Sequence, residues 1–457
     1  MTQYNRKAFY RNALLLVIPV ALQNIINVAI TATDVLMMGR VGEKALSGVS
    51  LAGQLQFVLT LILFGLTSGL SVLTAQYWGK KEVRAIEAIL GIALKLSVLI
   101  ALLFFVAVSL FPEPLMRIFS NDPEVIRHGV AYLRIVAWSY PLAAISTVYA
   151  FTMRSLERVM LGMAMYLISW IINVIFNAIF IFGLLGAPAM GAAGAAVGTL
   201  MARVAEMAVV IFYDRNRNTV FRFKWRFLNQ ATPVLKKDFI TYSAPVLINE
   251  LLWGMAVSAG TAILGQQGSA VSAANSVAQV TRQLSQVLTF GVAAATAIMV
   301  GKMIGEGKRE MAKIYARRFI NLSFVTGGIA CLIILLVRGP ALMIADVSVQ
   351  SRDYLSGMML NLAWFVILQS FNTTMIVGVF RAGGDSKFGL IIDAVSMWSG
   401  SLIIGFLGAF VFRWPVLWVY AALLSDEIIK TPLSLWRYLS GKWCTDVTRD
   451  LNEKPAE

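Results

Sequence analysis

The feature that most constrains this chain is a succession of long apolar runs separated by short polar segments. About 20 apolar residues in a helix cross the hydrocarbon core of a bilayer. Twelve such runs can be distinguished: 13–38, 46–78, 88–111, 126–153, 159–183, 190–213, 239–264, 271–304, 319–337, 353–380, 388–411 and 415–436. The second and eighth are long enough to require a tilt or a kink. We therefore predict an all-α integral membrane protein with twelve transmembrane helices.

The distribution of Lys and Arg predicts the orientation of these helices. With the N-terminus inside, 27 of the 39 basic residues lie in cytoplasmic segments, 8 lie outside and 4 lie within spans. Basic residues in short loops remain cytoplasmic. Both termini are therefore expected in the cytoplasm, in the cell (inner or plasma) membrane of a prokaryote. The net charge of +15 then reflects topology and contact with membrane lipids, and we expect no nucleic-acid partner.

An internal repeat relates the two halves of the chain. Shifts of 226 or 227 residues superpose Pro19 on Pro245, Gly39 on Gly265, Gly42 on Gly268, Gly65 on Gly291, Gly79 on Gly305, Arg154 on Arg381 and Gly162 on Gly389. Each half contains six spans, an even number, so the repeat is parallel. We predict two homologous lobes, 1–213 and 239–436, around a central cavity, with a basic cytoplasmic linker at 214–238 and a cytoplasmic tail at 437–457.

Four polar residues in the first half lie at similar depth within their spans. An intramembrane acid such as Asp34 is costly, by at least about 2.5–3.5 kcal/mol, and is a functional candidate. Asn173 and Asn177 are spaced i, i+4 and face the same way. Together with Thr199 they offer an all-oxygen set suited to a hard cation such as Na⁺, or to a protonated Asp34. The alternative is that the asparagines only hydrogen-bond helices together.

The second half carries its own ionisable candidates. Glu250, near the middle of the seventh span, is expected to bind a cationic substrate or a proton, unless it is a buried, permanently protonated acid. Arg282 and Asp393 are further candidates for lining a cavity. Trp253 and Met255 would form an adaptable wall, because aromatic rings attract cations and methionine repacks readily.

Charged residues in the sixth and twelfth spans have simpler interpretations. Arg203 and Glu206 lie within one turn and are expected to neutralise each other. Asp426, Glu427 and Lys430 are expected either to do the same or to extend toward the interface.

Taken together, these residues resemble the multidrug and toxic compound extrusion (MATE) family of transporters. The matching pieces are Ile18-Pro19-Val20 with Thr33-Asp34 and Gly39, Ala244-Pro245-Val246 with Glu250, the Asn173/Asn177 pair, the glycine-rich entry to the sixth span, and Arg381-Ala-Gly-Gly-Asp385-Ser-Lys387. The resemblance implies twelve helices in two bundles and exchange of a substrate for Na⁺ or H⁺. It assigns Asp34, Asn173, Asn177 and Thr199 to a cation site in the first lobe.

The resemblance also implies that some members have an acidic site in the second lobe. In those members the glutamate corresponding to Glu250 pairs with an aspartate eleven residues before the Arg-Gly motif. That position is Ser370 here, which argues against a charge-dense site in this lobe.

The predicted function is that of a secondary active antiporter that exports organic cations, drugs or toxic metabolites by alternating access of two lobes. Gly305-Glu306-Gly307-Lys308 lacks the spacing of a phosphate-binding loop, so we expect no enzyme activity, no cofactor, and coupling to Na⁺ or H⁺. The partners expected are lipids and amphipathic small molecules, and the protein is expected to be a monomer.

Two alternatives remain open. A lipid-linked oligosaccharide flippase would need a cationic cavity, for which only Arg203 and Arg282 are available. A receptor or scaffold would carry larger loops than those in this chain.

Overall fold

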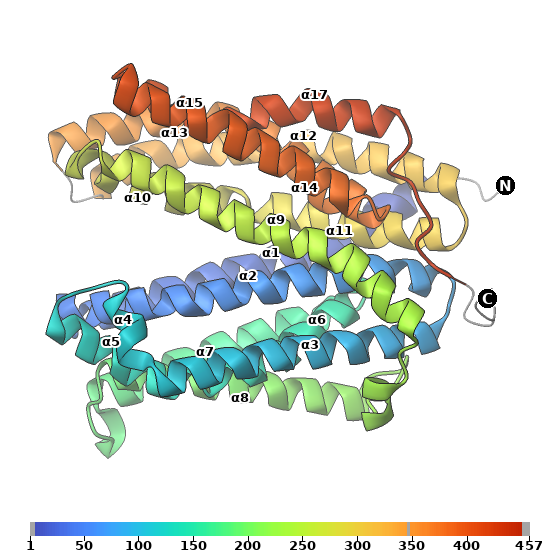
Figure 1. The fold of residues 1–457 in the computed structure, drawn as a ribbon, viewed down its shortest axis with the longest axis horizontal. Helices are drawn as coiled ribbons and strands as arrows, with labels where there is room; N and C mark the ends of the chain where they lie inside the picture. The colour runs from blue at the N-terminus through green and yellow to red at the C-terminus, as the bar shows by residue number, and fades with distance from the viewer. Residues whose placement is uncertain (1–4, 345–347, 450–457) are drawn as a thin grey trace. The chain divides into compact units, whose positions relative to one another are not determined.

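The computed structural model describes residues 5–344 and 348–449, and these residues form helices and connecting turns with no β-strand (Figure 1). Residues 1–4 of the predicted first lobe and 450–457 of the predicted tail lie outside the described residues.

The first half of the chain contains eight α-helices. They are α1 (Arg6–Gly39), α2 (Glu43–Gly79), α3 (Val83–Leu110), α4 (Pro112–Arg117), α5 (Pro123–Val136), α6 (Ser139–Ser155), α7 (Met160–Phe182) and α8 (Ala192–Asn216). Short 3₁₀ segments follow at Leu184–Gly186 and Trp225–Asn229.

The described residues of the second half form nine α-helices. They are α9 (Pro233–Gly265), α10 (Ser269–Ser285), α11 (Val287–Gly305), α12 (Arg309–Ile344), α13 (Val349–Thr373), α14 (Ser386–Ala394), α15 (Leu402–Phe406), α16 (Val416–Leu423) and α17 (Asp426–Leu439). Three π-helical segments, Thr374–Phe380, Val395–Ser401 and Leu407–Val411, continue α13, α14 and α15.

Of the twelve predicted membrane-spanning helices, the described residues match up to eleven, and three of the predicted spans are interrupted. Ten helices of the described chain are long and apolar enough to cross a bilayer, and α5 with α6, bent by 54°, makes an eleventh span. The eighth predicted span is interrupted at Gln286, between α10 and α11. The twelfth, 415–436, is divided into α16 and α17, of 8 and 14 residues.

A serine accompanies the break in the twelfth span. Ser425 Oγ donates a hydrogen bond of 2.6 Å to the carbonyl of Ala422, and such side-chain bonds compete with the helical ladder. Neither α16 nor α17 alone reaches the roughly 20 residues that a span requires.

The described residues fall into two compact units, each of which is considered by itself. The N-terminal unit comprises Leu22–Thr74 and Glu82–Ser243. The C-terminal unit comprises Met1–Ala21, Ala75–Lys81 and Ala244–Glu457. The division falls inside α1, α2 and α9, within two residues of Pro19 in α1 and of Pro245 in α9. Proline removes one helical hydrogen bond at each of these points.

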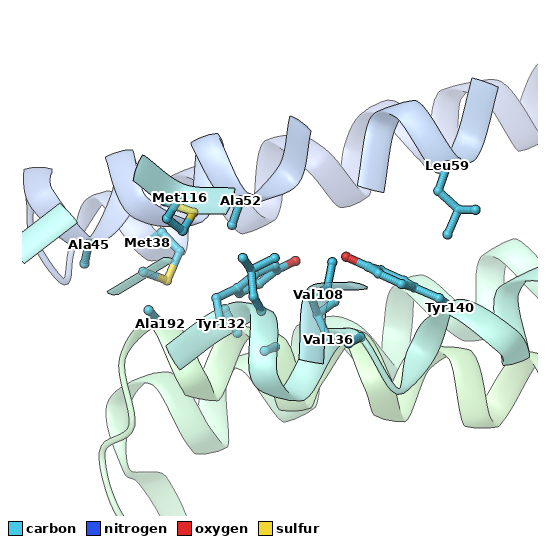
Figure 2. Close-up of a cluster of buried hydrophobic side chains, with 14 of the residues drawn as sticks. Met38, Ala45, Ala52, Leu59, Val108, Met116, Tyr132, Val136, Tyr140 and Ala192 are labelled. Carbon is cyan, nitrogen blue, oxygen red and sulfur yellow. The ribbon is translucent and has the colours of Figure 1, made fainter. Parts of the chain in front are cut away.

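The core of the N-terminal unit is built around two tyrosines and several alanines. Figure 2 shows Tyr132 of α5 and Tyr140 of α6 with their hydroxyl ends directed toward each other, among Met38, Ala52 and Leu59. Small side chains let membrane helices approach closely, which raises their van der Waals contact.

The α7–α8 pair packs closely around two glycines of α8. The helices run side by side in Figure 1. A Cβ atom on Gly194 would lie 2.3 Å from the carbonyl oxygen of Phe180, and one on Gly198 would lie 2.0 Å from Asn177 Oδ1. Only glycine allows this approach, which brings the polar residues of α7 against α8.

Candidate functional site

The structure brings together three of the four residues predicted as a cation site in the N-terminal unit. Asn177 Nδ2 in α7 donates hydrogen bonds to Asp34 Oδ1 in α1, at 2.6 Å, and to Asn173 Oδ1, at 3.1 Å. Both asparagines are buried. Among the described residues, no Lys or Arg forms an ion pair with Asp34. The direct hydrogen-bond partner of this carboxylate is therefore a neutral amide.

One oxygen of this cluster has no hydrogen-bond donor. Asn177 Oδ1 is fully buried and unpartnered, and it lies against the backbone of Gly198. Buried polar atoms are normally satisfied, so an unpartnered one calls for an explanation. A cation or a protonated group at this point would supply the missing partner.

The fourth predicted residue, Thr199, is adjacent in sequence to Gly198, but no contact joins it to Asp34 or to the asparagines within the described chain. Its hydroxyl donates to the carbonyl of Ala195 at 3.1 Å, and the phenol of Tyr132 lies close to it. The sequence interpretation missed Tyr132, because a tyrosine on an amphipathic helix carries no signal that distinguishes a site residue from a core residue.

Arg203 acts on Asp34 electrostatically, but it is already engaged by another residue. Its Nη1 lies 2.8 and 2.9 Å from the two carboxylate oxygens of Glu206, one turn along α8. The predicted mutual neutralisation of these two residues is confirmed.

The donor set around Asp34 fits a hard monovalent cation. Such ions prefer oxygen ligands, and the cluster offers carboxylate oxygens, two amide carbonyls and the nearby hydroxyl of Thr199. It contains no cysteine or histidine, and no group of three metal-ligating side chains exists in the described residues. The same geometry also suits a carboxyl group that alternates between its ionised and protonated forms.

Glu250 in the C-terminal unit has a partner that the sequence interpretation did not identify. Arg381 Nη2 lies 2.7 Å from Glu250 Oε1, and both side chains are largely buried. The repeat contained a signal, because Arg381 superposes on Arg154, whose Nη2 donates to Gln23 Oε1 at 2.7 Å. Each unit therefore ties an arginine to a polar residue near the middle of a long helix.

Asp393 belongs to a second buried ionic group. Lys430 Nζ lies 2.9 Å from Asp393 Oδ1 and 2.7 Å from Asp426 Oδ2, and Asn249 Nδ2 donates to the other Asp393 oxygen at 2.9 Å. Lys430 is only 4% exposed. Of the two expectations for this residue, neutralisation is therefore confirmed and extension toward the interface is wrong.

Trp253 and Arg282 line a small cavity of about 60 Å³ within the C-terminal unit. That volume admits a few water molecules. The other polar lining residues are Thr261, Asn275, Gln279, Ser401, Tyr420, Asp426 and Glu427. Met255 is largely exposed and, like Asp393, does not line this cavity.

Ser370 is buried, and its hydroxyl lies 2.6 Å from that of Thr289. The position where some relatives of the resembled family carry an acid is therefore occupied by a neutral, hydrogen-bonded pair.

Comparison with known proteins agrees with this architecture. The MatE family profile matches residues 19–179 and 244–407, which covers both repeats. A probable multidrug resistance protein of Bacillus subtilis, YoeA, is 23% identical, with 88% of each chain covered. A probable multidrug resistance protein of Mesorhizobium japonicum, NorM, is 26% identical, with 94% of this chain and 93% of the relative covered.

Solved structures show the same fold. The Vibrio cholerae MATE transporter VcmN, in a mutant form, superposes with a TM-score of 0.87 at 16% identity, covering 96% of this chain and 98% of the other. The predicted two-lobed all-α membrane fold is confirmed by this likeness and by the helices described above. Because the family profile matches most of the chain and both of its repeats, the protein is a member of the MatE family of transporters.

Proposed function

We propose that this protein is a secondary active antiporter that exports amphipathic organic cations, drugs or toxic metabolites in exchange for Na⁺ or H⁺. The observation that carries the proposal is the partly buried carboxylate of Asp34, which accepts a hydrogen bond from the neutral amide of Asn177, whose own amide oxygen is unpartnered. The multidrug resistance named for the two bacterial relatives supports the substrate class.

Each residue of the cluster has a part in this proposal. Asp34 supplies the charge that a cation or a proton neutralises. Asn177 positions that carboxylate through its amide N–H and offers its own carbonyl oxygen to a bound cation. Asn173 holds the Asn177 amide in place, and Thr199 contributes a hydroxyl beside Gly198.

Coupling follows when the loaded and unloaded forms of Asp34 favour different states of the protein. A ligand shifts a conformational equilibrium only by its differential affinity for the two states. We propose that the cation stabilises the state that releases substrate outward, with the lobes at 1–213 and 239–436 alternating access around the basic linker. Both termini are placed in the cytoplasm by the distribution of basic residues.

The role that we propose for Glu250 is more limited than the binding of a cationic substrate or a proton that the sequence predicted. Arg381 already balances the Glu250 charge at 2.7 Å, so a cationic substrate or a proton would have to compete with a guanidinium. We propose that Glu250 contributes to substrate binding only when this pair is loosened.

A transport assay in proteoliposomes tests the proposal. Purified protein is reconstituted, the vesicles are loaded with a fluorescent organic cation, and Na⁺ and H⁺ gradients are imposed in separate experiments that measure its efflux. We expect substrate movement against its own gradient with one of the two ions. Absence of uphill movement with both ions, for a panel of organic cations, would refute the proposal.

A further inference from the structure

Lys430 occupies a position in the C-terminal unit that resembles that of a bound cation. Its ammonium group lies between Asp393 of α14 and Asp426 of α17, at 2.9 and 2.7 Å. Asn249 of α9 donates to the second oxygen of Asp393, while its own Oδ1 is buried and unpartnered. Carboxylate oxygens from α14 and α17 therefore bind one positive charge that arrives on a side chain instead of from solution.

The equivalent position in the N-terminal unit is arranged differently. A shift of 227 residues places Arg203 on Lys430, Thr199 on Asp426 and Tyr166 on Asp393. Arg203 binds Glu206 on its own helix and leaves Asp34 without an ion pair. The N-terminal unit thus leaves the Asp34 carboxylate available to an exchangeable cation. In the C-terminal unit, Asp393 and Asp426 are instead ion-paired with the ammonium group of Lys430, which belongs to the chain itself.

We propose that Lys430 is a built-in substitute for an exchangeable cation, so that the Asp393–Asp426 site is permanently loaded and the C-terminal unit exchanges no ion of its own. This inference rests on the proposed function, in which the exchangeable cation acts at Asp34. It implies that one cation site, the one in the N-terminal unit, drives each transport cycle.

The charge balance of the region supports a latent cation site beneath Lys430. The acids are Asp393, Asp426 and Glu427, with Glu250 nearby but neutralised by Arg381. The bases are Lys430 and Arg282, the latter acting on Glu427. Removing the Lys430 charge therefore leaves three carboxylates facing one guanidinium, and such an excess of negative charge attracts small cations.

A small cation can be accommodated beside the vacated position. The cavity of about 60 Å³ is lined by Asp426 and Glu427. Sodium and ammonium ions are comparable in size to a water molecule and fit within this space, and choline serves as the larger reference cation.

The test uses the full-length protein and measures binding by thermal unfolding. The Asp34→Asn variant removes the exchangeable site, and Lys430→Met is added to remove the tethered charge while keeping the apolar stem. Melting temperatures are compared in sodium, ammonium and choline chloride at equal ionic strength. We expect no cation-dependent shift for Asp34→Asn alone, and a saturable upward shift of about 2 °C or more for the double variant in sodium or ammonium.

Two controls complete the design. The double variant already lacks the tethered charge. Adding Asp426→Asn to it also removes one carboxylate, and should abolish the cation-dependent shift of the melting temperature. Lys430→Arg, combined with Asp34→Asn, retains the tethered charge and should show no shift. A double variant that folds only in sodium or ammonium salt supports the proposal equally.

Three results would overturn the proposal. The first is a sodium-dependent shift of the melting temperature in Asp34→Asn alone. The second is a double variant whose melting temperature is the same in all three salts, and the third is failure of the double variant to fold in any of them. These readouts require no transport, so they are separate from a failure of the proposed function, which would appear as loss of uphill efflux in the wild-type protein.

Discussion

The two units share a repeat but arrange their buried charges in opposite ways. In the N-terminal unit, Asp34 is held by amides and has no ion-pair partner among the described residues. In the C-terminal unit, Glu250 is bound to Arg381, and Asp393 and Asp426 are bound to Lys430. An unpaired buried acid is costly, whereas a paired one is locked in place by the penalty for separating the charges. We propose that the same helical framework supports one site that changes its charge and one that is fixed.

The largest effect is expected from neutralising the acid that can change its charge. Asp34→Asn keeps the shape of the side chain, so the protein should insert and fold normally. Uphill efflux should fall to background, because a permanently neutral residue cannot differ between loaded and unloaded forms. Gradient-driven efflux in vesicles with equal amounts of folded protein measures this loss.

Asn177→Ala serves as the matched control for that variant. It removes a neutral ligand and leaves the charge, so the efflux rate should fall by less than in Asp34→Asn. An Asp34→Asn protein that pumps at the wild-type rate would remove the N-terminal site from the mechanism.

A second prediction disturbs the same site without touching a polar residue. In Gly198→Ala, the new Cβ atom would lie 2.0 Å from Asn177 Oδ1, so the amide must leave its position on Asp34. We expect a reduction of uphill efflux by about tenfold, corresponding to about 1.4 kcal/mol lost from the coupled state.

Gly53→Ala in α2 is the control for this glycine, because its new Cβ meets no atom within 4 Å. It should transport normally. Equal behaviour of the two alanine variants would show that close packing at Gly198 does not position the site.

The third prediction sharpens the contrast at Glu250. Glu250→Gln recreates the neutral arginine–amide contact that Arg154 and Gln23 form in the other unit, whereas Glu250→Ala removes the acceptor altogether. Loss of one partner of a buried ion pair typically costs about 3–5 kcal/mol, so the alanine variant should be the less stable of the two. Thermal unfolding of both variants, in parallel with efflux, measures this order.

The ion response of efflux should survive in Glu250→Gln, since the exchangeable site lies elsewhere. Loss of the Na⁺ or pH response together with normal substrate binding would place a coupling group at Glu250 instead.

The sequence predicted the parts of this architecture that depend on local pattern. Apolar runs of helical length identified the spans, and the i, i+4 spacing of Asn173 and Asn177 placed both amides on the face that meets Asp34. The interruption after Leu424 coincides with Ser425-Asp426-Glu427. A serine followed by acids is a signal for a helix start, and the sequence interpretation did not use it.

The ion pairs of the C-terminal unit could not be predicted from the sequence pattern. Arg381 and Glu250 are 131 residues apart, and Arg381 stands at the start of a Gly-Gly turn typical of a cytoplasmic loop. The contact of Lys430 with Asp393 depends on the packing of α17 against α14. Sequence spacing predicts neighbours on one helix, but it does not predict which helices meet.

The smallest effect on stability is expected at the N-termini of α5 and α13, which occupy equivalent positions in the repeat. A shift of 226 residues places Asp122, which precedes α5, on Ser348, which precedes α13. Asp122 Oδ1 accepts a 2.8 Å hydrogen bond from the backbone N–H of Glu124, and Ser348 Oγ accepts one of 3.2 Å from that of Ser351. Both residues cap a helix, but only one cap carries a charge.

The charged cap should make the stability of the N-terminal unit depend on pH. The backbone N–H of Glu124 holds the pKa of Asp122 below its ordinary value, which is about 3.9 in an unfolded chain. A depressed pKa contributes stability that is fully present above the unfolded value and is lost as the pH falls through the folded value. Asp122→Ser should therefore lower the melting temperature slightly at neutral pH and have no effect well below pH 4.

The reciprocal exchange provides the control for this prediction. Ser348→Asp should introduce the same acid-sensitive contribution at the start of α13, because the negative charge would face the unpaired N–H groups of a helix N-terminus. Melting temperatures of both variants and the wild-type protein, measured from neutral pH down to about pH 3, give the two differences. If Asp122→Ser shifts the melting temperature equally at both ends of this range, the cap acts through its hydrogen bond alone and the two helix starts are electrostatically equivalent.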